Sequence, residues 1–387
     1  MAYPPMAGGA DYTLDIGKLK SFSFEIGAIR PPSEGGSFSL LLRVTRNCPW
    51  NRCTFCYGNH YNHERFELRS VAEIKADIES IKAINNEIKA LSWKLGYAEK
   101  IEPLAAVIHS GLVYSQDTRP FTDDELRNFH CVVNVFNWLC SGGKTAFLQD
   151  ADTLIMRTNE LIEVISYLKE TFPSIERVTS YARSKTVARK KADDLNQLHK
   201  AGLSRLHIGL ETGDDELLGY VDKGVTAEEH IIAGKKAMEA GFELSVYVMP
   251  GLGGKSRWVQ HARNTTRVLN EINPHFIRLR PFVPRPNTPM LEAYQRREFE
   301  LTSPRERLQE IRLMIENLKV TSRVCFDHNL NTSYWAGNRL IPLMRQDYNG
   351  YKLPEEKELV LELINSGLEM NEAAFVSIED MMSRHNF

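Results

Sequence analysis

The sequence predicts an α/β fold, a parallel sheet covered by helices on its outside. Three observations lead to this prediction. Short β-rich runs alternate with amphipathic helical stretches from about residue 39 onward. Several of the strand-like runs are continuously apolar, as expected for strands that are covered on both faces. The chain has 387 residues, 42% of them hydrophobic and 25% charged, which suits a soluble protein with a substantial core.

Six β-α units are expected along the chain. Each unit has a predicted strand followed by a predicted helix. The pairs are strand 39–46 with helix 71–89, strand 145–149 with helix 153–169, strand 177–182 with helix 186–199, strand 205–210 with helix 227–240, strand 242–248 with helix 257–271, and strand 276–281 with helix 305–318. This order favours a single parallel sheet, because parallel strands need a crossover connection between them and a helix usually supplies it.

Three regions lie outside this alternation. Residues 88–144 are too long for an ordinary connection, and we expect an insert with a helix near 123–139 that acts as a lid and specificity element. Residues 1–36, rich in Gly and Pro, form a lead-in. Residues 321–387 form a mainly helical appendage with a possible strand at 324–327.

Charge and terminal patterns exclude several classes of protein. With 48 basic and 50 acidic residues the net charge is −2, so a nucleic-acid partner is not expected. No run of 18 apolar residues predicts a transmembrane span, and we expect no membrane partner. The first ten residues lack the basic and apolar regions of a signal peptide. Clustered thiols without a secretion signal then predict a cytoplasmic protein.

The most informative motif is C-x4-C-x2-C, formed by Cys48, Cys53 and Cys56 directly after the first predicted strand. Soft thiolates select zinc or iron–sulfur clusters. One interpretation is structural zinc, with His60 and His63 as further ligands. A second is a plant-type [2Fe–2S] site, which opens with the same spacing but needs a fourth cysteine nearby. A third is a [4Fe–4S] cluster with one iron that no protein group binds.

The segment 29–56 resembles the radical SAM superfamily, more closely the branch related to oxygen-independent coproporphyrinogen oxidases and elongator-type enzymes. Phe55 before the last cysteine is part of that pattern, whereas the x4 spacing departs from the commoner C-x3-C-x2-C. The resemblance extends over about residues 29–330. It implies a partial (β/α)6 TIM-like barrel at 37–320, with the lead-in, the helical insert and the C-terminal appendage added to it.

The resemblance also implies a function. A [4Fe–4S] cluster on Cys48, Cys53 and Cys56 would bind S-adenosylmethionine, cleave it reductively and so abstract hydrogen from a substrate. The balanced charge favours a substrate of small or medium size. An electron donor such as flavodoxin or ferredoxin is the expected partner. The alternative from a different class is a non-catalytic scaffold that carries zinc or an iron–sulfur cluster.

The remaining cofactor contacts are inferred from the same resemblance. Gln149 and Asp150 stand where relatives have a Gly-rich run near the methionine amine, although the glycines are missing here. Tyr181 and Arg183 close the third strand near the position of the ribose. Glu211 ends the fourth strand at a position that contacts the cofactor.

Further along the chain, Lys223 matches a basic residue that pairs with the cofactor carboxylate, and the backbones of Val246 and Phe55 would cover the adenine. Arg278 and Arg280 share one face of the sixth strand. They favour an anionic substrate group unless both pair with acidic residues.

Asp327 and His328 in the appendage allow two interpretations. They could form a proton-transfer pair at physiological pH. A hydrogen-bonded turn with Asn329 and Asn331 is the other.

Overall fold

The computed structural model describes residues 19–28, 38–56, 64–108 and 122–384. His60 and His63 of the zinc interpretation lie outside these residues, as does part of the expected lid. No helix in the described ranges is long and apolar enough to cross a membrane.

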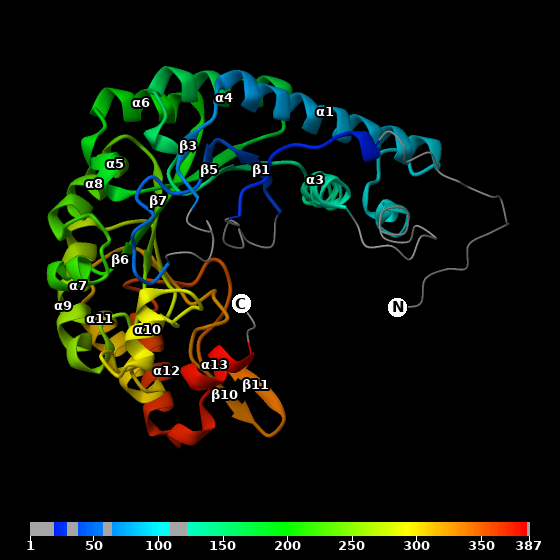
Figure 1. Ribbon diagram of the computed structural model, residues 1–387. Helices are drawn as coiled ribbons and strands as arrows, with labels where there is room; N and C mark the ends of the chain where they lie inside the picture. The colour runs from blue at the N-terminus through cyan, green and yellow to red at the C-terminus, as the bar shows by residue number, and fades with distance from the viewer. Residues whose placement is uncertain (1–18, 29–37, 57–63, 109–121, 385–387) are drawn as a thin grey trace.

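One eight-stranded sheet forms the centre of the molecule (Figure 1). Its strands, in spatial order, are β1 (Leu40–Arg43), β4 (Thr145–Gln149), β5 (Arg177–Ala182), β6 (Leu203–Glu211), β7 (Glu243–Val248), β8 (Phe276–Leu279), β9 (Arg323–Cys325) and β12 (Tyr351–Lys352). Neighbours from β1 to β9 are parallel, and β12 pairs antiparallel with β9. The sheet is open because β1 and β12 stand at opposite edges, so the predicted class of a partial parallel barrel is confirmed.

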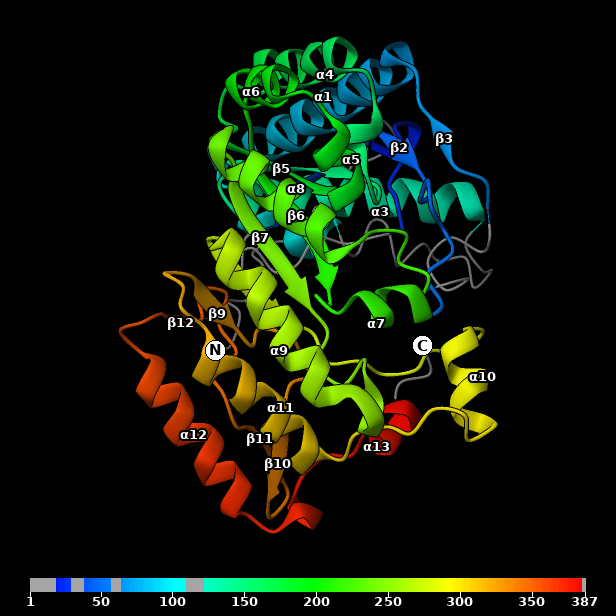
Figure 2. The same cartoon turned by 90° about the vertical axis from the view of Figure 1, so that its left-hand side faces the viewer.

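The helices that the structure describes are α1 (Val71–Lys94), α3 (Asp123–Cys140), α4 (Thr158–Thr171), α5 (Ser184–Arg189), α6 (Ala192–Ala201), α7 (Asp215–Tyr220), α8 (Ala227–Glu239), α9 (Gly254–Ile272), α10 (Pro289–Gln295), α11 (Pro304–Asn317), α12 (Lys357–Glu369) and α13 (Ile378–Arg384). Of these, α4, α6, α8 and α9 lie on the outer side of the curved sheet (Figure 1). The 3-10 turns are η1 (Leu19–Ser21), η2 (Glu102–Leu104), η3 (Thr153–Ile155) and η4 (Glu372–Ala374). Helices α9, α11 and α12 pack side by side (Figure 2).

Two strand pairs stand apart from the central sheet. They are β2 (Thr45–Arg46) with β3 (Glu67–Leu68), and β10 (Ser333–Ala336) with β11 (Arg339–Pro342). The first pair flanks the cysteine motif, with β2 before Cys48 and β3 after Cys56.

Four helices begin with a reciprocal capping box, in which a hydroxyl and a glutamate satisfy each other's backbone N–H groups. The pairs are Ser70 and Glu73 (α1), Thr122 and Glu125 (α3), Thr226 and Glu229 (α8), and Ser303 and Glu306 (α11). These caps define where the helices start. The predicted helix 186–199 is two helices, because Lys190 and Lys191 between α5 and α6 have extended backbone.

The two faces of the sheet have different side chains because neighbours along a strand point to opposite sides. Leu206, Ile208, Leu244, Val246 and Ile277 belong to the large core that the strands share with the helices. The alternate positions carry aromatic and polar groups that contact one another across the strands. The ring centroids of Phe147 and Tyr181 are 5.0 Å apart, and those of His207 and Tyr247 are 5.6 Å apart.

A second apolar cluster lies under the cysteine motif. Cys53 and Phe55 from the motif pack there with Val221 after α7, Met290 of α10 and Met381 of α13. Segments distant in sequence therefore support the thiols together.

Candidate functional site

Cys48, Cys53 and Cys56 line one cavity of about 190 Å³ beyond the carboxyl ends of the parallel strands. None of the three forms a disulfide. No three His, Cys, Asp or Glu side chains within the described ranges are grouped for a single metal ion. An iron–sulfur cluster does not require three ligands around one ion, because each thiolate binds a different iron of the cluster. Thiolates are the ligands that iron–sulfur clusters select.

The fold of the cysteine loop follows from its asparagines and its contacts. Asn47 and Asn51 have positive φ angles of 65° and 44°, a conformation that asparagine tolerates better than most residues. Thr54 N donates to Val221 O at 3.0 Å. Trp50 Nε1 donates to Asp222 O at 2.6 Å. These bonds attach the loop to the end of α7.

The thiols are crowded as well as buried. Burial raises the pKa of Cys56 to about 12, and the neighbouring Cys53 and Cys48 add to the rise. Burial also raises the pKa of Cys53, where Lys223 opposes the effect. Each ionised thiol disfavours the ionisation of its neighbours. A cationic group bound between the three would favour their thiolate forms.

Glu211 and Lys223 form an ion pair in the same cavity. Lys223 Nζ lies 2.9 Å from Glu211 Oε1, and the two side chains are only 15% and 12% exposed. Burial alone lowers the pKa of Lys223, but Glu211 and Cys53 outweigh it and raise this pKa above its usual value. Gly209 makes room for the carboxylate, since a Cβ there would lie 2.2 Å from Glu211 Oε1.

Three more predicted residues reach the cavity, namely Phe55, Tyr181 and Arg183. Arg183 Nη2 donates to Lys223 O at 3.1 Å, and its guanidinium lies 5.2 Å from the centre of the Trp50 ring. Val246 belongs to the core beneath the sheet instead and lines neither cavity described here.

Sequence reasoning missed several cavity residues, among them Tyr247, Ser184 and His230. Tyr247 follows Val246 on the same strand. We predicted a backbone contact at Val246 and did not consider the side chain of the next residue, which is the one that lines the cavity. Ser184 Oγ and His230 Nδ1 share a hydrogen bond of 2.6 Å. Burial lowers the pKa of His230 to about 3, helped by Lys223 and Arg183, so the imidazole is neutral.

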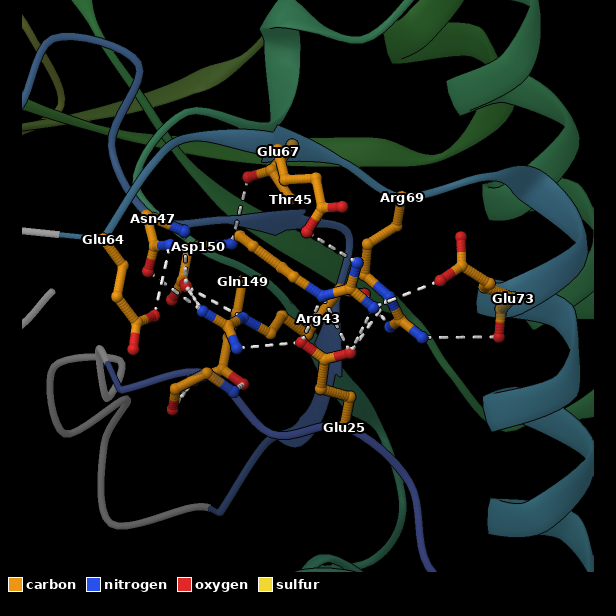
Figure 3. Close-up of polar contacts among 12 residues, drawn as sticks. Glu25, Arg43, Thr45, Asn47, Glu64, Glu67, Arg69, Glu73, Gln149 and Asp150 are labelled. Atoms are coloured by element: carbon orange, nitrogen blue, oxygen red, sulfur yellow. Dashed lines mark hydrogen bonds and ion pairs between the residues drawn. The ribbon is translucent and has the colours of Figure 1, made fainter.

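Gln149 and Asp150 lie beside the cavity but do not line it. Both are fully buried. Gln149 Oε1 accepts from Gly27 N at 3.0 Å, and Asp150 Oδ2 accepts from Arg43 Nη2 at 2.7 Å and from Asn47 N at 3.3 Å (Figure 3). Their polar groups are used to hold the lead-in and the start of the cysteine loop.

Glu25 of the lead-in completes this arrangement (Figure 3). Its carboxylate accepts from Arg43 Nη1 at 2.8 Å and from Arg46 Nη2 at 2.7 Å, and it lies 3.4 Å from Arg69 Nε. Arg46 is two residues before Cys48, so the position of the lead-in is linked to that of the first thiol.

A second cavity of about 250 Å³ adjoins the first. The two share Phe55, Cys56, Tyr181, Glu211 and Tyr247 as lining residues.

The two predicted strand arginines differ in their surroundings. Arg278 is fully buried, and its Nη1 lies 2.5 Å from Asp327 Oδ2. Arg280 lines the second cavity together with Arg285 and His328. His328 Nδ1 accepts from Leu330 N at 3.2 Å, so Asp327 and His328 take separate partners.

Comparison with known proteins finds similarity over part of the chain. The Radical SAM superfamily profile matches residues 124–263. A tRNA uridine(34) acetyltransferase of Methanocaldococcus jannaschii is 25% identical over 108 residues, which are 28% of this chain and 20% of that protein. The corresponding protein of Methanocaldococcus infernus is 24% identical over 119 residues, 30% of this chain and 22% of its own length. The chain thus spans about a fifth of the length of these curated relatives.

Solved structures with a similar arrangement are more distant. The archaeal Elp3 of Methanocaldococcus infernus has a TM-score of 0.41 at 16% identity, covering 58% of this chain and 55% of that one. Coproporphyrinogen III oxidase of Escherichia coli has a TM-score of 0.37 at 18% identity, covering 45% and 39%.

Proposed function

We propose that this chain is a radical SAM enzyme in which Cys48, Cys53 and Cys56 hold a [4Fe–4S] cluster with one iron left for S-adenosylmethionine. The family profile that matches residues 124–263 supports this proposal. The observation that carries the proposal is that three free thiols and the Glu211–Lys223 pair line a single cavity. When bound, the cluster and S-adenosylmethionine would supply reductive cleavage of the sulfonium and abstraction of hydrogen from a substrate.

The residues of the chain bind and orient the reactants. The ammonium group of Lys223 lies in the cavity, where it would pair with the carboxylate of the cofactor. The carboxylate of Glu211 would accept hydrogen bonds from the ammonium or hydroxyl groups of the cofactor. Phe55, Tyr181 and Arg183 provide the surrounding wall. The apolar cluster beneath the loop excludes water from the thiols.

The finer assignments are proposals of the same kind. The electron donor is a flavodoxin or ferredoxin type of protein, and the substrate is of small or medium size. We assign the catalytic domain to residues 37–320, flanked by 1–36 and 321–387, with the insert at 88–144 as its lid.

Anaerobic reconstitution tests the proposal. With dithionite and S-adenosylmethionine, the protein should release 5′-deoxyadenosine. Cys48→Ser, Cys53→Ser and Cys56→Ser should each abolish both iron binding and this release. Cys140→Ser, at the far end of α3, should leave both unchanged. A reconstituted protein that binds iron but releases no 5′-deoxyadenosine would instead be a scaffold.

A further inference from the structure

We propose that the substrate carries an anionic group, a carboxylate or a phosphate, which binds Arg280 and Arg285 in the second cavity. This inference rests on the proposed function, because it names the substrate class of the same site.

The position of the second cavity suits a substrate. Five residues line both cavities, among them Cys56 and Glu211. A molecule in the second cavity would therefore lie directly beside the thiols and the proposed cofactor contacts. Reacting groups must be neighbours for a hydrogen atom to pass between them.

Arg280 differs from Arg278 in forming no ion pair with a carboxylate among the residues that the structure describes. Arg278 is neutralised by Asp327 at 2.5 Å. Arg280 Nε is buried and has no hydrogen-bond partner among the residues that the structure describes. Its guanidinium lies 4.5 Å from the centre of the Tyr247 ring, which orients the cation without neutralising it.

Basic side chains outnumber carboxylates among the described residues that line the second cavity. Glu211 is the one carboxylate among its described lining residues, and Lys223 already pairs with it. Arg285 adds a second guanidinium to the same wall. Burial lowers the pKa of Arg285, and the nearby Arg280 charge contributes to the decrease while Cys56 opposes it. A carboxylate or a phosphate in this space would lie within reach of both half-buried guanidinium groups.

The chemistry of the wall defines the ligand further. A guanidinium presents a planar pair of donors that matches a carboxylate or a phosphate. Most other lining groups are apolar, namely Phe55, Met249, Pro281, Phe282, Val283 and Leu330. We therefore infer an apolar or aromatic body attached to the anionic group.

Calorimetric titration of the reconstituted chain tests the inference without turnover. The probes are 3-phenylpropionate, phenyl phosphate and the neutral 3-phenylpropionamide. The wild type should bind at least one anion and not the amide, and the tighter anion distinguishes carboxylate from phosphate. Arg280→Gln and Arg285→Gln should each weaken this binding about tenfold or more, which corresponds to about 1.4 kcal/mol.

Matched variants control for folding and charge. Arg280→Lys retains a cation and should bind with intermediate affinity, while Arg339→Gln, exposed on β11, should bind like the wild type. Circular dichroism establishes that each variant is folded.

Three results would overturn the inference. They are equal affinity of the amide and the anions, unchanged binding in Arg280→Gln, and failure of both anions to bind the wild type. Arg280→Gln that weakens S-adenosylmethionine and leaves the anions unaffected would also overturn it, by assigning Arg280 to the cofactor. Failure of the proposed function appears separately, as a wild type that releases no 5′-deoxyadenosine although the anion binds at Arg280.

Discussion

His261 on α9 donates from Nδ1 to Glu310 Oε1 on α11 at 2.5 Å, and both side chains are fully buried. The other ring nitrogen, Nε2, faces the backbone oxygen of Glu211 at 3.3 Å. Glu310 Oε2 also accepts from Gly251 N at 2.7 Å. Glu211 has a positive φ of 63°, unusual for a residue with a side chain. The buried pair therefore supports a strained residue at the wall of the cavity.

The His261–Glu310 pair should matter for stability. Glu310→Ala leaves a buried imidazole and a backbone N–H without their acceptor and should lower the free energy of unfolding by about 3 kcal/mol. Urea unfolding measures this change. Glu316→Ala, on the exposed side of the same helix, should cost less than about 1 kcal/mol. Equal effects of the two variants would refute a special role for the pair.

The Glu211–Lys223 pair should control cofactor affinity. Lys223→Met removes the cation from the cavity and leaves Glu211 unpaired, so S-adenosylmethionine should bind about tenfold more weakly or worse. Equilibrium binding to the reconstituted protein measures this. Lys235→Met breaks an exposed pair with Glu271 and should leave the affinity unchanged. Comparable losses in both variants would mean that only the overall charge matters.

The Glu25 contacts should make the lead-in sensitive to acid. Burial tends to raise the pKa of Glu25, but Arg46, Arg69 and Arg43 together lower it below its usual value. A carboxylate with a lowered folded-state pKa stabilises the protein above its unfolded-state pKa, about 4.3, and loses this contribution as pH falls through the folded-state value.

The stability difference between wild type and Glu25→Gln should therefore be largest near neutral pH and shrink below about pH 4. Urea unfolding of the metal-free chain at several pH values checks this. Glu239→Gln, exposed on α8, is the control and should show no such trend. A difference that does not depend on pH would contradict the role of the Glu25 charge.

Gly224 should be required for the cysteine loop to reach its position. It has a positive φ of 69°, and a Cβ there would lie 2.4 Å from Trp50 Cε2. Gly224→Ala should displace Trp50 and reduce iron incorporation, measured as iron per protein after reconstitution. Gly219→Ala, where a Cβ meets nothing within 4 Å, should load iron normally. Full loading of Gly224→Ala would show that the loop tolerates the displacement.

Much of the fold was predictable because it depends on local pattern. The apolar runs gave all six expected strands from β1 to β8, and the hydroxyl–glutamate pairs at the helix starts were visible in the sequence. The incorporation of β9 and β12 into the central sheet was not predicted. These strands are three and two residues long, too short for alternation to be recognised, and only pairing along the sheet edge defines them.

The site was predictable where strand ends converge. Tyr181 and Glu211 lie at the ends of neighbouring parallel strands, so their meeting follows from the topology. The contacts of Asp150 were not predictable. Its partners Arg43 and Asn47 are more than 100 positions away, and nothing in the sequence relates them to Asp150. Arg285 lies beyond β8 in a segment without periodicity, so its direction depends on the three-dimensional path of the chain.

The apolar cluster beneath Cys53 and Phe55 includes Val376, Ile378 and Met381. Translation proceeds from the amino end, so the ribosome makes this part of the supporting wall long after the thiols that rest on it. In a nascent chain, the three cysteines would therefore lie on an incomplete apolar cluster until α13 has been made. Delivery of iron and sulfide should accordingly be a late event, after synthesis has passed α13.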